Sequence, residues 1–255
     1  MSLRNNGKQK EGITIETKRL NGNCAEDIVI AAELLKNGGL VAIPTETVYG
    51  LAADATNGAA VERIFKAKGR PQDNPLIVHI SSYEQLERLV SHIPEHAKRL
   101  METFWPGPLT VILPKSNLIP DQVSAGLPTV AVRLPSHPVA RAVIQEAGVP
   151  LAAPSANVSG SPSPTAAAHV LHDLDGKIDA VIDGGPCTIG LESTVITLAE
   201  ETPVLLRPGA VTLEQLQQVL GTVKMADAVL HQLKQGSRRR DKELTHCRSR
   251  WDRRG

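Results

Sequence analysis

Residues 61–80 read VERIFKAKGRPQDNPLIVHI, and this stretch contains the step from helix to strand that decides the fold class. Its first half has apolar side chains at helical spacing, which predicts an amphipathic helix. The residues of that apolar face are Val61, Ile64, Phe65 and the stem of Lys68. Gly69 is suited to end the helix, and Pro71 prevents its continuation. The run LIVHI that follows is typical of a buried strand.

The same alternation continues on both sides of this stretch. Further helices are predicted at residues 25–37, from about Tyr83 with Ser81 or Ser82 as N-cap, and at 94–103, 138–146, 165–172 and 213–220 with Thr212 as N-cap. Further strands are predicted at residues 40–43, 109–113, 129–134, 150–154, 179–183, 194–198 and 204–207. The last two strands are expected to pair antiparallel. Because parallel and antiparallel signals are mixed, the sequence predicts one α/β domain with a twisted mixed sheet and flanking helices.

Composition supports this fold class and divides the chain into three parts. Apolar residues make up 41% of the 255 residues but aromatic residues only 2%, so the core must consist mainly of Ala, Val, Leu and Ile. We expect a flexible N-terminus at residues 1–12 and the folded domain at 13–224. Residues 225–255 are basic and lack apolar periodicity, which predicts a disordered tail.

Charge and cysteine content limit the cellular compartment and the classes of partner expected for the protein. Residues 1–224 carry 19 Lys and Arg against 23 Asp and Glu, whereas residues 225–255 carry 9 against 4. An acidic body argues against a nucleic-acid surface across the domain, although weak RNA contact through the tail stays open. The three cysteines show no metal or redox spacing, and the chain has neither a long apolar run nor an apolar N-terminus. We therefore expect a cytoplasmic protein without membrane contact.

Lys68 and Arg70 are the first candidates for chemistry. Two cations one residue apart, between a helix end and a strand start, could clamp a polyphosphate, but a solvated surface pair fits this segment equally well. The chain contains no G-x-x-x-x-G-K-[ST], G-x-G-x-x-G or H-E-x-x-H motif. Any nucleotide must therefore be held without a P-loop, and no metal site built from histidines is expected.

Polar clusters follow several of the predicted strands. They are residues 44–50, 154–165, 192–194 and 207–209, and Arg133 within residues 129–134 is placed by strand alternation to face a cleft. Each cluster alone is compatible with ordinary turn chemistry. Several clusters together with three arginines point instead to a site for a small polar substrate and phosphates.

The motifs that carry these clusters occur in a recognisable order. They are IPTETVYGL, K-x-R-P with NPLIVHI, PGPLTVIL, VAVRLP, APSANVSGSPSPT, ESTV and LRPGA. Over about residues 13–221 the chain resembles the YrdC family, the threonylcarbamoyl-AMP synthases of tRNA modification. The resemblance implies a YrdC-like α/β fold around a large open cavity. It also implies a nucleotidyltransferase that forms L-threonylcarbamoyl-AMP, pyrophosphate and water from ATP, L-threonine and bicarbonate.

The resemblance further assigns roles to residues. The product would pass to the threonylcarbamoyl-transfer machinery that modifies adenosine 37 in tRNAs reading ANN codons. Lys68 and Arg70 would be catalytic, stabilising phosphate charge with Mg²⁺ that arrives with ATP and without a tightly bound protein-ligated metal. The implied ATP-binding residues are Lys68, Arg70, Asn74, Thr129, Ser155, Asn157, Ser163 and Arg207. The implied L-threonine-binding residues are Thr45, His79, Arg133, Ala153 and Ser193.

The residue types of Arg133 and His79, and of two nearby glutamates, also suggest roles without the resemblance. A bidentate guanidinium fits a carboxylate, so Arg133 is the natural partner of the threonine carboxylate. His79, taken alone, is typical of a core histidine with satisfied hydrogen bonds. Glu46 and Glu192 are possible buried partners of the arginines, which the sequence does not decide.

The chain departs from the family pattern in one respect, and two other functions stay open. Longer relatives carry a second C-terminal domain, joined by a linker with a tyrosine that folds over the ATP pocket, and neither is recognisable here. We therefore expect a more open pocket and weaker ATP binding. The alternatives are a carbamoyl-adenylate-forming domain related to hydrogenase maturation, and a non-catalytic RNA-binding module. Pyrophosphate release that requires both L-threonine and bicarbonate separates them.

Overall fold

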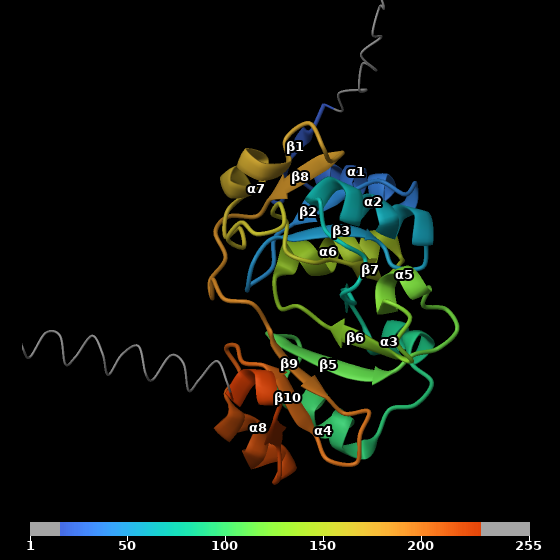
Figure 1. Ribbon diagram of the computed structural model, residues 1–255. Helices are drawn as coiled ribbons and strands as arrows, with labels where there is room; N and C mark the ends of the chain where they lie inside the picture. The colour runs from blue at the N-terminus through green and yellow to red at the C-terminus, as the bar shows by residue number, and fades with distance from the viewer. Residues whose placement is uncertain (1–15, 231–255) are drawn as a thin grey trace, which may run out of the picture.

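The structure, a computed structural model, describes residues 16–230 (Figure 1). Within this range the strands form one 11-stranded sheet in the order β1-β8-β2-β3-β7-β4-β6-β5-β9-β10-β11. The strands are β1 (Lys18–Asn21), β2 (Val41–Ile43), β3 (Gly50–Asp54), β4 (Ile77–His79), β5 (Leu109–Pro114), β6 (Thr129–Arg133), β7 (Leu151–Ala152), β8 (Ala180–Asp183), β9 (Thr194–Thr197), β10 (Val204–Arg207) and β11 (Lys224–Met225). The helices are α1 (Ala25–Lys36), α2 (Gly58–Lys68), α3 (Tyr83–Leu89), α4 (Glu95–Phe104), α5 (Asp121–Ser124), α6 (Pro138–Ala147), α7 (Ala167–Leu174) and α8 (Leu213–Leu220).

The sheet is mixed, as predicted. Parallel pairs include β4–β6 and β5–β9, and antiparallel pairs include β2–β3 and β5–β6. The antiparallel pairing of β9 with β10 confirms the prediction for residues 194–198 and 204–207. Because the strand order is far from the sequence order, segments distant in the chain meet at the centre of the sheet.

Helices cover both faces of the sheet. In β2 the side chains of Val41 and Ile43 belong to one apolar cluster and Ala42 belongs to the other, as strand alternation requires. The smaller cluster lies beneath α1 and α6, which pack against each other, and the larger cluster extends along the rest of the sheet. In Figure 1, α1, α2, α6 and α7 surround the half of the sheet that contains β1–β3, and α3, α4 and α8 lie at the half that contains β5, β9 and β10.

Local signals place most helix ends correctly. Gly69 and Gly148 are left-handed at the ends of α2 and α6, and Thr212 forms a capping box with Gln215 at the start of α8. Ser82 is the N-cap residue of α3, but its side chain makes no capping hydrogen bond.

The predicted helix at residues 165–172 begins two residues late, at Ala167. The Thr165 carbonyl accepts a hydrogen bond from the Cys187 amide, at 2.9 Å, and Ala166 is extended, so neither residue is helical.

Four short elements were not predicted: β1, β3, α5 and β11. The sequence of β3 is GLAAD, which lacks β-branched residues and alternation because all five residues are buried. The sheet reaches Met225, one residue beyond the expected domain end. The flexible N-terminus expected at 1–12 and most of the tail expected at 225–255 lie outside the described residues. Among the helices of residues 16–230, none combines the length and apolarity needed to cross a membrane.

Candidate functional site

A cavity of about 250 Å³ lies at the centre of the sheet, where five segments meet. They are the loop after β2, the segment from the end of α2 to β4, the end of β6, the loop after β7, and the residues before β9 together with the end of β10. The parallel register of β4 and β6 places His79 directly beside Arg133, and a bridge joins Gly50 to Ser155. The volume is slightly below the ~300–1,000 Å³ of typical small-molecule sites.

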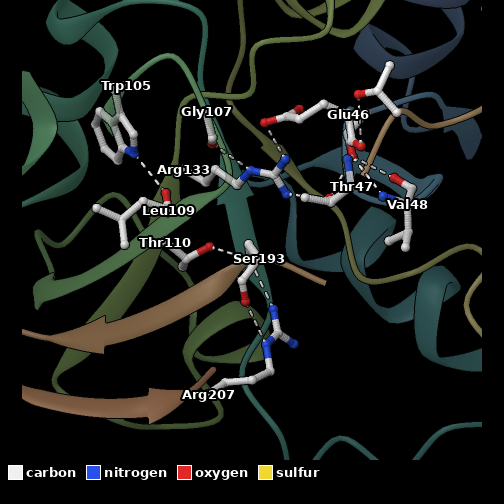
Figure 2. A network of polar contacts seen from close by, with 12 residues as sticks. Glu46, Thr47, Val48, Trp105, Gly107, Leu109, Thr110, Arg133, Ser193 and Arg207 are labelled. Carbon is white, nitrogen blue, oxygen red and sulfur yellow. Dashed lines mark hydrogen bonds and ion pairs between the residues drawn. The ribbon is translucent and has the colours of Figure 1, made fainter. Parts of the chain in front are cut away.

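Arg133 is held on three sides at the inner wall of this cavity. Its Nη1 donates to Thr47 Oγ1 at 2.8 Å and its Nε to the Gly107 carbonyl at 3.1 Å (Figure 2). Nη2 lies 2.8 Å from Glu46 Oε1 without the alignment of a hydrogen bond, so this contact is an ion pair. Both side chains are buried. Burial alone would raise the pKa of the Glu46 carboxyl, but the charge of Arg133 and its contact hold that pKa below the ordinary value.

Arg207 organises the opposite wall of the cavity, the outer wall. Its Nε donates to the Ser193 carbonyl at 2.9 Å, its Nη2 donates to Ser193 Oγ at 3.0 Å, and its Nη1 contacts the Glu192 carboxylate. Ser163 Oγ donates to the other Glu192 oxygen at 3.0 Å. Glu46 and Glu192 are thus the carboxylate partners of Arg133 and Arg207, which decides the question that the sequence left open.

The predicted pair of cations is divided between two environments. Arg70 lines the cavity, whereas Lys68 is 2% exposed and does not. Lys68 Nζ donates to the backbone carbonyls of Ser155 and Asn157, and the Lys68 carbonyl accepts from the Ser159 amide at 2.9 Å. Burial, and then the charge of Arg70, lower the pKa of Lys68 to about 8. In this geometry Lys68 fastens the loop after β7 to the end of α2.

His79 has an unusual environment for a core histidine. It is 3% exposed, it lines the cavity, and its Nδ1 has no hydrogen-bond partner among the described residues. Burial, and then the charge of Arg133, lower its pKa to about 3, so the imidazole is neutral at pH 7. The interpretation as a core histidine with satisfied hydrogen bonds therefore does not hold at Nδ1.

Most of the other predicted site residues also meet at the cavity. Its lining contains Thr45, Arg70, His79, Arg133, Ala153, Ser155, Ser193 and Arg207. Outside the lining lie Lys68, Asn74, Thr129, Asn157 and Ser163. Asn74 is exposed and contacts Asp73, Thr129 begins β6, and Asn157 is buried with its amide on the carbonyls of Val158 and Ser161.

Several lining residues were not predicted. Thr47 contacts Arg133 directly, and its only signal in the sequence is its place in the polar cluster that follows β2. Backbone and apolar wall come from Val48, Gly50, Pro75, Leu76, Ile77 and Pro154, and Glu192 adds its carboxylate. Within residues 16–230 no group of three or more His, Cys, Asp or Glu side chains could hold a metal ion. The carboxylate of Glu192 in the lining and that of Glu46 beside Arg133 already contact arginines.

Comparison with known proteins shows to which family the chain belongs. Residues 33–209 match the model of the Sua5/YciO/YrdC family, whose description is "Telomere recombination". The chain belongs to this family.

Two relatives are named threonylcarbamoyl-AMP synthase. One, from Bacillus subtilis, is 55% identical over 217 residues, covering 85% of this chain and 62% of the relative. The other, from Pyrococcus abyssi, is 57% identical over 202 residues, covering 79% of this chain and 59% of the relative. The chain therefore spans about three fifths of the length of these relatives.

Solved structures agree with this placement. P. abyssi Sua5 complexed with L-threonine superposes with a TM-score of 0.80 and 54% identity, covering 85% of this chain and 63% of that one. The same comparison confirms the predicted YrdC-like α/β fold. The nucleotide-bound structure of full-length HypF, at 22% identity and a TM-score of 0.62, shares the fold only.

Proposed function

We propose that the cavity forms L-threonylcarbamoyl-AMP and pyrophosphate from ATP, L-threonine and bicarbonate. The observation that carries the proposal is the convergence of Arg70, Arg133 and Arg207, from three separate segments, on one cavity. Relatives up to 57% identical that are named threonylcarbamoyl-AMP synthase support it. Three cations around one small cavity suit a reaction between several anions, because they neutralise charge that would otherwise keep the substrates apart.

The inner wall suits the amino acid. Arg133 lines the cavity, and its Nη1 carries a second N–H, besides the one donated to Thr47, for a carboxylate. His79 Nδ1 is buried and without a partner, and Ser193 and Thr45 are close by in the lining. The P. abyssi Sua5 structure complexed with L-threonine supports L-threonine as a substrate.

The outer wall suits the nucleotide. Arg70, Ser155 and Arg207 line it, and Lys68 fixes the loop that carries Ser155. In this proposal Mg²⁺ enters bound to the triphosphate, because Mg²⁺ prefers substrate phosphates and the carboxylate in the cavity lining, that of Glu192, already pairs with Arg207. Asn74, Thr129, Asn157 and Ser163 then act at the rim or behind the wall.

The chemistry requires positioning more than acid–base catalysis. The threonine amine captures CO₂ derived from bicarbonate as a carbamate, and a carbamate oxygen attacks the α-phosphorus of ATP while pyrophosphate leaves. Arg70 and Arg207 oppose the charge that develops on the phosphates. We place the protein in the cytoplasm and expect its product to supply the transfer of the threonylcarbamoyl group to adenosine 37 of tRNAs reading ANN codons.

Pyrophosphate release tests the proposal directly. We expect release from ATP that requires both L-threonine and bicarbonate, and at least a roughly 100-fold slower rate for Arg70→Ala, since one group that stabilises transition-state charge contributes about 10²–10³ in rate. Arg141→Ala, which removes an exposed arginine of α6, is the matched control and should leave the rate unchanged. Release that is independent of L-threonine, or equal rates in the Arg70→Ala variant and the wild type, would contradict the proposal.

A further inference from the structure

Thr110 lies behind the cavity wall, and its hydroxyl contacts a single residue. It belongs to β5, is fully buried and does not line the cavity. Its Oγ1 lies 2.8 Å from Oγ of Ser193, which does line the cavity (Figure 2). The contact follows from the parallel register of β5 and β9, in which Leu109 lies opposite Thr194. The sheet itself therefore holds the two hydroxyls together.

The direction of this hydrogen bond follows from the partners available. Arg207 Nη2 lies 3.0 Å from Ser193 Oγ and can only donate. Thr110 Oγ1 has no other hydrogen-bond partner among residues 16–230, so its proton has only Ser193 Oγ as acceptor. If Ser193 donated instead, the Thr110 proton would be left buried and unsatisfied, which is costly. Thr110 is thus the donor and Ser193 the acceptor.

Two donors on one hydroxyl oxygen decide what Ser193 can offer a ligand. Both of its lone pairs are occupied, and its single proton remains to point into the cavity. The hydroxyl of Thr45, also in the cavity lining, differs. It donates to the Val48 carbonyl at 2.6 Å and accepts from the amides of Thr47 and Val48, each at 3.2 Å. Thr45 therefore keeps no proton for a ligand.

We infer that Thr110 is a positioning residue that fixes Ser193 as a hydrogen-bond donor to an oxyanion of the substrate. The oxyanion is the carboxylate of the amino acid or a phosphate oxygen of ATP. A substrate ammonium cannot bind at Ser193 Oγ because no lone pair is free there. The inference rests on the proposed function and adds a determinant of how the substrates are oriented in the site.

The test measures binding of L-threonine and of a non-hydrolysable ATP analogue separately, by calorimetry. Thr110→Val removes the hydroxyl at nearly constant shape, and we expect roughly tenfold weaker binding of one of the two ligands, about the effect of one misdirected hydrogen bond. The ligand that weakens identifies the source of the oxyanion. Thr110→Ser keeps the hydroxyl and should restore the affinity.

Thr194→Val is the matched control for a general effect of losing a buried hydroxyl. Thr194 is also fully buried, but its hydroxyl donates to the Val211 carbonyl at 2.7 Å and accepts from the Val211 amide at 3.1 Å, and it does not line the cavity. This variant should bind both ligands like the wild type. In steady-state pyrophosphate release, Thr110→Val should raise KM for the affected substrate more than it lowers kcat.

A double-mutant cycle completes the test. In a Ser193→Ala background the donor is already gone, so Thr110→Val should change the affinity no further. Three results would each overturn the inference. Thr110→Val could bind both ligands like the wild type, Thr194→Val could lose as much affinity as Thr110→Val, or Thr110→Val could cause the same loss in the Ser193→Ala background as in the wild type. If the wild type still releases pyrophosphate in these cases, the proposed function stands. A wild type that binds neither ligand and releases no pyrophosphate would overturn both.

Discussion

The two walls of the cavity differ in how much of their geometry exists before any ligand binds. At the inner wall, Arg133 is 3% exposed and each of its nitrogens contacts a protein group. At the outer wall each Arg207 nitrogen also contacts a protein group, but Arg207 and Glu192 are more than a third exposed, and the Arg70 side chain makes no hydrogen bond or ion pair within the described residues. The inner wall is thus buried and fixed by protein contacts, whereas the outer wall is more exposed and includes a side chain, Arg70, that no protein contact fixes. Substitutions at the two walls should therefore have different consequences for folding.

The largest loss of unfolding free energy is expected when Glu46 is replaced. Glu46→Ala leaves Arg133 buried without a counter-charge, and breaking a buried pair in this way costs about 3 kcal/mol or more of unfolding free energy. Urea unfolding of variant and wild type measures the difference. A loss below about 1 kcal/mol would show that the inner wall relaxes or admits water, and the contrast between the walls would not hold.

A smaller effect on stability is expected from the titration of His79, and it depends on pH. Its pKa is lowered to about 3 in the folded state, while the unfolded side chain titrates near 6.5. The unfolded state thus binds more protons between these values, and stability is lost as pH falls from about 6.5 toward 3.

Between pH 7 and 4.5 this linkage corresponds to about 2 kcal/mol. His79→Asn removes the titrating group, so the loss of stability over that interval should be smaller than in the wild type. Urea unfolding at the two pH values measures it. Parallel pH profiles for the variant and the wild type would show that the imidazole reaches water in the folded state.

The smallest effect is expected at Glu192. Its side chain is 39% exposed and that of Arg207 36%, so solvent screens the pair, and Glu192→Ala should cost less than about 1 kcal/mol of unfolding free energy. The same urea experiment applies. A cost equal to that of Glu46→Ala would mean that both walls are equally preorganised.

Sequence reasoning found the elements whose signals are local. The helix that ends at Gly69 and the helix capped by Thr212 were predicted because periodicity and capping residues are adjacent in the chain. Strand β3 was missed because full burial removes alternation from GLAAD. Its identity as a strand depends on pairing with β2 and β7, which the sequence of β3 does not encode by itself.

The site shows the same limit at the level of single side chains. The K-x-R spacing drew attention to Lys68 and Arg70 together, but the last turn of α2 directs Lys68 inward to the carbonyls of Ser155 and Asn157. Thr110, inside the run LTVIL, has the sequence signal of a strand-forming residue only. Its contact with Ser193 joins residues 83 positions apart in the chain and exists only through the β5–β9 register.

The strand order has a consequence for the kinetics of folding. The cavity takes side chains from the loop after β2, third in the sheet, to Arg207 at the end of β10, tenth in the sheet. Such non-local pairing closes late and slows folding. Competence to bind is therefore acquired only when both halves of the sheet have joined. A substrate that binds this assembled state alone draws the equilibrium toward it, so occupancy of a small cavity protects the whole sheet against unfolding.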